Sequence, residues 1–135
     1  MIALDTNVLV RYLVRDDAEQ AEAARALLES LTTDRPGYVC REVAVELVWV
    51  LERAYGFSRD RIATILEELV ATEGLVIEAA DDVARAAFRY RIGGAGFSDM
   101  MIVTAAERAG ALPLYTFDQK AARLEGAALL ENDAS

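Results

Sequence analysis

Short apolar runs alternate along the chain with longer segments in which apolar residues recur at helical spacing. The short runs have the length and the turn-forming neighbours of buried strands, which predicts strands at residues 2–4, 38–40, 75–77, 113–117 and 127–130. The longer segments predict helices at residues 18–31, 41–55, 59–72, 81–91 and 99–109. Strands that alternate with helices indicate an α/β fold, with three α/β/α layers around a central, mostly parallel sheet.

Polar residues at the segment boundaries predict where helices begin. Asp5 directly follows the first strand and can cap a helix that starts there, and Ser58 and Ser98 can cap the helices that follow them. Asp16, with Glu19 three residues later, resembles a capping box for the helix that begins at residue 18.

The chain has the length of one ordinary domain. Its 135 residues contain no obvious linker, low-complexity tract or repeat, so we expect one domain over residues 1–135. The single cysteine, Cys40, has no partner for an internal disulfide and is expected to be a buried thiol. Neither a secretory signal nor an apolar run near the length of a membrane span is recognisable, so the sequence predicts a cytoplasmic protein without a membrane anchor.

The net charge of −9 argues against a protein that holds nucleic acid through a broad positive surface. This objection is limited, because 13 of the 14 basic residues are arginines, which suit bidentate phosphate contacts. A bound divalent cation would also reverse the sign of the local charge where a phosphate binds. A nucleic-acid substrate is therefore compatible with the composition.

Four acidic residues border or interrupt apolar segments: Asp5, Glu46, Asp99 and Asp118. Asp5 and Asp118 each follow a predicted strand, and the carboxyl ends of parallel strands form the ligand crevice of such a sheet. Glu46 stands in a helical segment that is apolar on every side, so we expect it to be buried. A buried carboxylate needs a compensating partner, and the chain has no histidine and a single lysine, Lys120.

A divalent cation would compensate such a cluster. Two carboxylates about 4 Å apart repel each other by roughly 4 kcal/mol at an effective dielectric constant of about 20. Ligation by oxygen alone favours Mg²⁺, with Mn²⁺ as a substitute, over Zn²⁺. The natural chemistry of such a site is hydrolysis of a phosphodiester by metal-activated water, which needs no side-chain nucleophile.

Each acid also has a structural interpretation. Asp5 suits a helix N-cap, Asp99 suits the first turn of a helix, and Asp118 suits a turn, so for these residues both interpretations stay open. Glu46 is harder to explain structurally, because a glutamate in so apolar a helix rarely lacks a function. Glu42, one turn earlier on the same face, is either part of the site or a charge that stabilises the helix start.

The chain resembles the PIN-domain nucleases, and in particular the VapC-type ribonuclease toxins of bacterial toxin–antitoxin pairs. The resemblance extends from end to end and rests on four motifs in the family's order. These motifs are IALDTN at residues 2–7, VELVWVL at 45–51, GFSD at 96–99 and TFD at 116–118. The function that this implies is Mg²⁺-dependent cleavage of RNA by the toxin of such a pair.

The resemblance assigns a role to each acid. It implies that Asp5, Glu46 and Asp99 hold the principal metal ion, while Asp118 completes the acidic pocket and serves a second ion or positions water. Where many relatives carry a further acid before the phenylalanine, this chain has Gly96, so the expected site has four acids. The resemblance also implies supporting roles for three polar residues: Thr116, Thr6 and Asn7.

The resemblance also implies partners. These are an RNA substrate, a second copy of the chain in a homodimer, and a small cognate antitoxin that covers the groove and presents a basic residue to the acids. Several apolar side chains are candidates for such a surface, although their spacing favours a place in the core: Leu9, Val10, Leu13, Trp49, Ile62 and Leu66.

Other functions fit parts of the pattern. A phosphatase of the haloacid-dehalogenase type would need a second aspartate two residues after Asp5, where this chain has Asn7. A receiver domain would need adjacent acids after the first strand and a lysine at a late strand end, which Lys120 fits poorly. An RNA-processing nuclease outside any toxin pair stays open. A PIN domain that only binds would typically lose the acids that this chain keeps.

Overall fold

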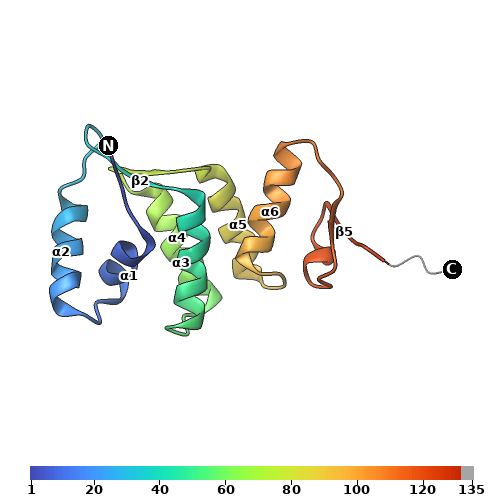
Figure 1. Cartoon of the computed structure of the whole chain (residues 1–135), viewed down its shortest axis with the longest axis horizontal. Helices are drawn as coiled ribbons and strands as arrows, with labels where there is room; N and C mark the ends of the chain where they lie inside the picture. The colour runs from blue at the N-terminus through green and yellow to red at the C-terminus, as the bar shows by residue number, and fades with distance from the viewer. Residues whose placement is uncertain (132–135) are drawn as a thin grey trace.

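A computed structural model describes residues 1–131, so the last four residues of the domain expected over 1–135 lie outside the described residues. Strands and helices alternate as predicted, which confirms the α/β class (Figure 1). None of the helices in the described range is long and apolar enough to cross a membrane. The elements are β1 (Ile2–Ala3), α1 (Thr6–Val14), α2 (Ala18–Glu29), β2 (Gly37–Val39), α3 (Arg41–Arg53), α4 (Arg59–Ala71), β3 (Leu75–Ile77), α5 (Ala80–Ile92), α6 (Phe97–Arg108), β4 (Leu114–Thr116), the 3₁₀ helix η1 (Ala121–Arg123) and β5 (Ala127–Leu129).

The strands pair in parallel, as predicted, but they form two ladders. β1, β2 and β3 make a three-stranded sheet in that order, with Ile2 opposite Gly37 and Gly37 opposite Leu75. β4 and β5 pair with each other, with Leu114 opposite Ala127. The strands have only two or three residues each, so few hydrogen bonds hold each ladder.

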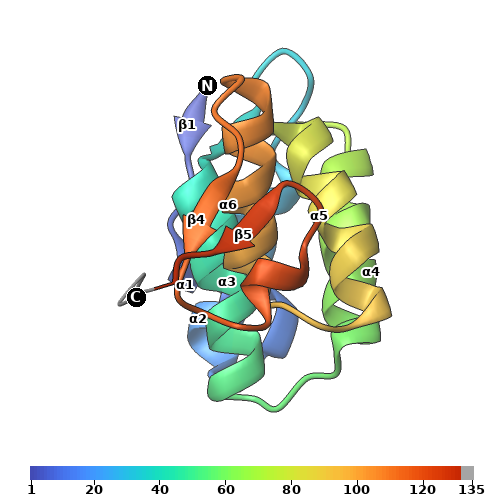
Figure 2. The same cartoon turned by 90° about the vertical axis from the view of Figure 1, so that its right-hand side faces the viewer.

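The second ladder packs on the far side of α6. We call residues 114–129, which comprise β4, η1 and β5, the C-terminal unit. A Cβ atom at Gly126 in this unit would lie 3.5 Å from Cγ2 of Val103 on α6, and the Val103 side chain is fully buried. α6 therefore lies between the C-terminal unit and the β1 edge of the first sheet, as Figures 1 and 2 show from two directions.

An apolar core joins the helices to the first sheet. Tyr90 on α5 is fully buried, its hydroxyl donates to a carboxylate oxygen of Glu52, and its ring meets that of Phe97 edge-on at 6.1 Å. Burial and the Glu52 carboxylate together raise the pKa of the Tyr90 hydroxyl above its usual value. Other large and fully buried side chains come from α1, α3, α4 and α6: Leu9, Leu47, Leu51, Ile62, Leu66, Met100 and Met101.

The core interpretation holds for most of the apolar residues that we considered for a partner surface. Leu13 is partly buried, whereas Trp49 exposes 60% of its surface and is available for a contact. Cys40, expected to be buried, is only partly buried and is a free thiol. Fully in the core are Leu9, Val10, Ile62 and Leu66.

Two of the predicted helix starts are confirmed and one is wrong. Asp5 and Ser58 begin α1 and α4, and each side chain accepts a hydrogen bond from a backbone N–H of the first turn. Ser98 does not cap α6, because the helix starts earlier and Gly96 is its N-cap residue. The Asp99 carboxylate accepts a hydrogen bond from Gly96 N–H at 3.3 Å, which stabilises this earlier start.

The capping box predicted for Asp16 is also wrong. The N-cap of α2 is Asp17, whose carboxylate accepts from Gln20 N–H at 3.0 Å. Asp16 instead accepts hydrogen bonds from the Arg11 guanidinium and the Tyr55 hydroxyl, both at 2.8 Å. Tyr55 follows α3, so a tertiary contact that local spacing cannot reveal takes Asp16 away from the helix end.

An ion pair between a buried carboxylate and an exposed guanidinium joins α5 to α6. Asp82 is 2% exposed, and Nε of Arg108 donates to both of its carboxylate oxygens at 3.1 Å. The Arg108 guanidinium holds the pKa of the Asp82 carboxyl below its usual value, against the opposing effect of burial. The pair therefore stabilises the fold above the unfolded-state pKa of the carboxyl, and this stabilisation is lost as the pH falls through the folded-state pKa.

Asp82→Asn should lower the free energy of unfolding at neutral pH by about 2 kcal/mol, because it removes the charge of a buried carboxylate that accepts hydrogen bonds from Arg108. Chemical denaturation would measure the loss, which should shrink as the pH falls below about 4. Glu22→Gln is the control, since Glu22 pairs with Arg25 on an exposed helix face, and it should change the free energy by less than about 0.5 kcal/mol. Equal losses in both variants would contradict the prediction.

Candidate functional site

Asp5 stands where β1 ends and α1 begins. Its backbone is extended, and its Oδ1 accepts a hydrogen bond from Thr6 N–H at 2.8 Å, so the residue is a helix N-cap. The short strand and the cap together place the carboxylate at the carboxyl end of β1, which is the edge where open parallel sheets bind ligands. Asp5 is exposed, and its second oxygen has no hydrogen-bond partner in residues 1–131.

Glu46 lies on the uncovered face of α3, so the expectation that it is buried is wrong. α3 contacts α1, α4 and α6 through its apolar side. The opposite side carries Glu42, Glu46 and Trp49, which are all exposed. The segment looks apolar on every side in the sequence because its exposed face also carries a large aromatic residue and is flanked by partly buried valines. The residues that face the core are Ala44, Leu47, Val48 and Leu51.

The two acids meet at one cavity of about 260 Å³, which α1 and α3 line from opposite sides. Asp5 and Glu46 both border it, together with Thr6 and Asn7 from the start of α1. Thr6 is 5% exposed, and its Oγ1 is buried without a hydrogen-bond partner in the described residues. A buried hydroxyl without a partner is rare and unfavourable, so this atom indicates a ligand next to the two carboxylates.

Arg11 brings a positive charge to the same cavity. Its Nε donates to Gln20 at 2.7 Å, and its Nη1 donates to Asp16 at 2.8 Å. The hydrogen bond with Tyr55, and then the charge of Asp16, raise the pKa of the Arg11 guanidinium above its usual value. The cation is thus held in place by Asp16 in the loop before α2, by Gln20 on α2 and by Tyr55 just after α3. The sequence analysis did not identify Arg11, because the residues that hold it come from three separate segments.

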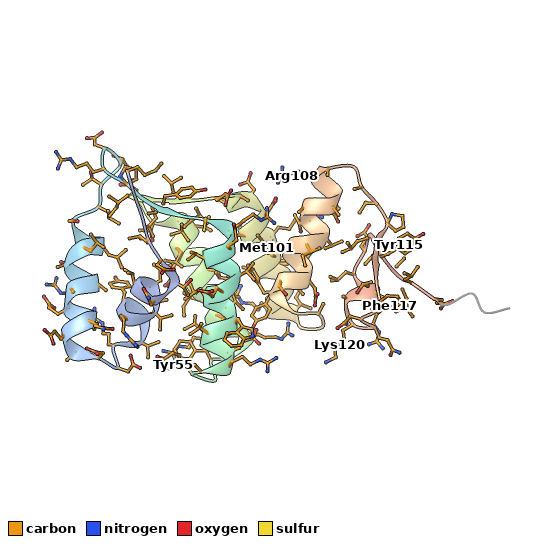
Figure 3. All side chains as sticks on the ribbon, viewed as in Figure 1. Tyr55, Met101, Arg108, Tyr115, Phe117 and Lys120 are labelled. Carbon is orange, nitrogen blue, oxygen red and sulfur yellow. The ribbon has the colours of Figure 1, made fainter. Side chains whose placement is uncertain are left out.

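A larger groove of about 880 Å³ runs between α3 and α6, and Glu46 borders this groove as well as the cavity. Its walls combine apolar side chains with charges of both signs: Arg41, Glu42, Trp49, Arg53, Phe97 and Ile102. Figure 3 shows Met101, another wall residue, between the two helices. Glu46 and Val50 thus line both the groove and the Asp5 cavity.

Asp99 lies in the first turn of α6 and is partly buried. Its neighbours Gly96 and Ser98 line the groove, while its carboxylate is engaged with the Gly96 N–H. The loop before α6 is held by Arg59, whose guanidinium donates to the carbonyl oxygens of Tyr90, Gly94 and Ala95 at 3.0–3.1 Å. Arg59 therefore positions the start of α6. Nothing in the sequence pattern distinguishes it from a surface arginine.

Asp118 lies in the C-terminal unit, away from the other acids. Its Oδ1 accepts from Ala121 N–H at 2.9 Å, and its N–H donates to Thr116 Oγ1 at 3.0 Å. α6 separates this unit from Asp5 (Figures 1 and 2). In residues 1–131, no group of three or more acidic, histidine or cysteine side chains is close enough to hold a metal ion. The structure thus brings together Asp5, Glu46, Thr6 and Asn7, and the four-acid site stays a prediction.

The donors at the cavity suit Mg²⁺. Proteins usually hold this ion through one or two carboxylates and leave its other positions to water and substrate phosphates. Asp5 and Glu46 supply the two carboxylates, and the Thr6 hydroxyl supplies an uncommitted oxygen beside them. The absence of histidine and of a nearby cysteine at this cavity disfavours a softer ion.

The family model described as "PIN domain" matches residues 2–127. The chain belongs to the PIN domain family. All four candidate acids of this PIN domain lie within the matched range. The chain is also similar to a protein described as VapC ribonuclease from Aquifex aeolicus (strain VF5), with 26% identity over 125 residues that cover 92% of each chain. The resemblance drawn from the four motifs is confirmed at the level of the family.

Thr6→Val should raise the free energy of unfolding in the absence of metal by about 1 kcal/mol, because it removes a buried hydroxyl that has no partner within residues 1–131. Thr104→Val is the matched control. Thr104 is 3% exposed and its hydroxyl donates to the Met100 carbonyl at 2.7 Å, so this variant should lose about 1 kcal/mol. Denaturant titration in a chelating buffer measures both. A loss at Thr6 as large as that at Thr104 would show that the Thr6 hydroxyl is hydrogen-bonded.

Proposed function

We propose that this PIN domain is a Mg²⁺-dependent endoribonuclease that hydrolyses phosphodiester bonds with water as the nucleophile. The observation that carries the proposal is the meeting of the Asp5 and Glu46 carboxylates at one cavity with the buried, unpartnered Thr6 hydroxyl. The family membership and the similarity to a protein described as a ribonuclease support the same activity.

Asp5 and Glu46 would hold the ion from opposite sides of the cavity, with the Thr6 hydroxyl beside them. Mn²⁺ would substitute, since it accepts the same oxygen ligands. When bound, the ion supplies an electrophile for the phosphate and lowers the pKa of a coordinated water. The chain has no histidine to activate a side-chain hydroxyl as the nucleophile, which favours water in that role.

Basic and aromatic side chains around the acids suit a bound RNA strand. Arg11 at the Asp5 cavity is a fixed cation for a backbone phosphate next to the reacting one. Arg41 and Arg53 border the groove that Glu46 also lines. Trp49, 60% exposed on the same wall, offers a surface on which a base can stack. Such contacts would hold an RNA strand along α3 despite the negative net charge.

We also propose that the enzyme is the toxin of a cytoplasmic toxin–antitoxin pair. An active ribonuclease endangers the cell that makes it, and a bound partner can supply the restraint. The groove between α3 and α6 suits an amphipathic helix of a small antitoxin, because exposed Trp49 and Ile102 offer apolar contacts and Glu42 and Glu46 offer partners for a basic residue. An RNA-processing nuclease outside any such pair is the alternative.

Asp5→Asn and Glu46→Gln should each lower Mg²⁺-dependent RNA cleavage by at least about a hundredfold, because each amide keeps the size of the acid but removes a metal-binding charge. The fold should persist, since asparagine also caps helices and Glu46 is exposed. Cleavage of a labelled RNA, with binding of Mg²⁺ measured by calorimetry, tests both effects. Glu68→Gln, at an exposed position of α4 that borders neither the cavity nor the groove, should cleave and bind like the wild type. Full activity in excess chelator would refute the proposal.

Expression of the chain alone in a bacterial host should arrest growth, and Glu46→Gln should abolish the arrest because it disables the proposed site. Co-expression of the small protein encoded beside it should restore growth. Colony counts after induction measure both effects. A harmless wild type in its own host, with no neighbouring gene that alters the outcome, would remove the toxin assignment and leave the nuclease proposal to the cleavage assay.

A further inference from the structure

A second cavity, of about 480 Å³, lies where α1 packs on α2 (Figure 1), and we call it the α1–α2 cavity. Its size falls within the usual range of small-molecule sites. Asn7 and Arg11, one helical turn apart on the same face of α1, line this cavity and the Asp5 cavity alike. The wall on α2 comprises Gln20, Ala23, Ala24 and Leu27. Two side chains thus lie between the candidate metal site and a cavity to which the proposed activity assigns no ligand.

The side-chain amide of Gln20 has a fixed orientation. Nε of Arg11 donates to Gln20 Oε1 at 2.7 Å. A guanidinium carries donors only, so the glutamine must turn its oxygen toward Arg11 and its NH₂ group away from it. Within residues 1–131, that NH₂ group has no hydrogen-bond partner. Gln20 therefore offers an uncommitted donor to the cavity that it lines, while its oxygen already serves Arg11.

Arg11 is itself held by residues outside the α1–α2 cavity. Its Nη1 donates to Oδ1 of Asp16 at 2.8 Å, and the Tyr55 hydroxyl donates to Oδ2 of Asp16 at 2.8 Å. These bonds fix the guanidinium and, through it, the Gln20 amide before any ligand binds. A donor held in this way loses little conformational freedom on binding, so it can discriminate between ligands.

The rest of the α2 wall is small and apolar. Gln20, the two alanines and Leu27 follow one another at the spacing of a single helix face. The alanines contribute only methyl groups, and Leu27 exposes 36% of its surface. In the described part of the chain, no acid lines the cavity, and Arg11 is its one charged lining residue. The cavity thus combines an apolar surface, two amide side chains and a cation.

We propose that the α1–α2 cavity binds a base of the RNA strand next to the cleaved phosphodiester, and that Gln20 selects this base; the inference rests on the proposed function. A nucleobase has two apolar faces and a polar edge, and unpaired bases of RNA are recognised through hydrogen bonds to that edge. The faces of the base contact Ala23 and Leu27, and its edge meets the amides of Gln20 and Asn7. Arg11, which lines both cavities, binds a phosphate that joins the two nucleotides.

Gln20 favours a base that carries a carbonyl oxygen on its edge. Its NH₂ group can donate to O6 of guanine or O4 of uracil, whereas adenine and cytosine carry an amino group at the corresponding position. An amino group opposite this donor leaves both groups unpaired, which is unfavourable. Asn7 can accept from the ring N–H that guanine and uracil carry beside the carbonyl, because its amide has no hydrogen-bond partner within residues 1–131. The cavity therefore selects guanine or uracil.

RNA oligonucleotides that differ only in the bases beside one mapped cleavage site test this specificity. The wild type should cleave those with guanine or uracil at one flanking position with a kcat/KM at least about fivefold above those with adenine, because adenine loses a hydrogen bond. Gln20→Ala should bring this ratio to within about twofold of unity. Gln20→Glu should reverse it in favour of adenine and cytosine, since a carboxylate offers acceptors only. Glu19→Gln, an exposed neighbour on α2 that lines neither cavity, should keep the wild-type ratio.

Filling the cavity gives a second test. Ala23→Leu places a larger side chain at an exposed position of the wall, so the fold should persist, which circular dichroism verifies. The KM for the preferred RNA should rise about tenfold while kcat changes by less than about twofold, because the lost contacts bind substrate and transition state alike. A base preference that is the same in the wild type, Gln20→Ala and Ala23→Leu would overturn the proposal.

Binding without cleavage separates this inference from the proposed function. Fluorescence anisotropy in a chelating buffer measures the affinity of each variant for the same labelled oligonucleotides. If the wild type cleaves no RNA, the proposed function fails, but a preference for guanine or uracil in binding that Gln20→Glu reverses would still establish the base site. Equal affinity of the wild type for all the oligonucleotides, or no binding of any of them, would refute it.

Discussion

α3 buries Ala44, Leu47, Val48 and Leu51 against its neighbours, and this packing determines where the functional residues lie. With that face committed to the core, Glu46 must project from the opposite side of the helix. There it meets the end of β1, where Asp5 leaves the sheet and caps α1. Apolar burial is the main favourable term in folding. Because it fixes how α3 packs, it also brings together two carboxylates from segments about forty residues apart.

The electrostatics of the cavity follow from how few partners the two acids have. Arg11, which lines the cavity, is engaged with Gln20 and Asp16, and it does not pair with Asp5 or Glu46 in the described part of the chain. The carboxylates therefore keep their charge available for a ligand, and the Thr6 hydroxyl is also uncommitted. Two unpaired carboxylates and a free hydroxyl suit the binding of a divalent cation together with a phosphate.

Where residues were misjudged from the sequence, a tertiary contact or a solvent-facing helix side was responsible. Asp16 stands one residue before the true cap and is drawn to Arg11 and Tyr55, which a local motif cannot anticipate. α6 starts at Phe97 because Asp99 bonds back to Gly96, so a glycine without a side chain takes the place expected for Ser98. A helix segment can be rich in valine and still present one face to solvent, as Glu46 demonstrates.

The sequence by itself determined the α/β order of elements, most helix ends, the four acidic motifs and the family, because these depend on local periodicity, caps and residue types in fixed order. It also placed Asp5 at a strand end and a helix start. Only the tertiary structure decided that Glu46 is exposed and shares a cavity with Asp5, that Arg59 holds the loop before Asp99, and that Asp118 lies beyond α6. These facts depend on which helix faces pack together and on which strand edges pair, and strands of two or three residues encode too few contacts in their own sequence to specify their neighbours.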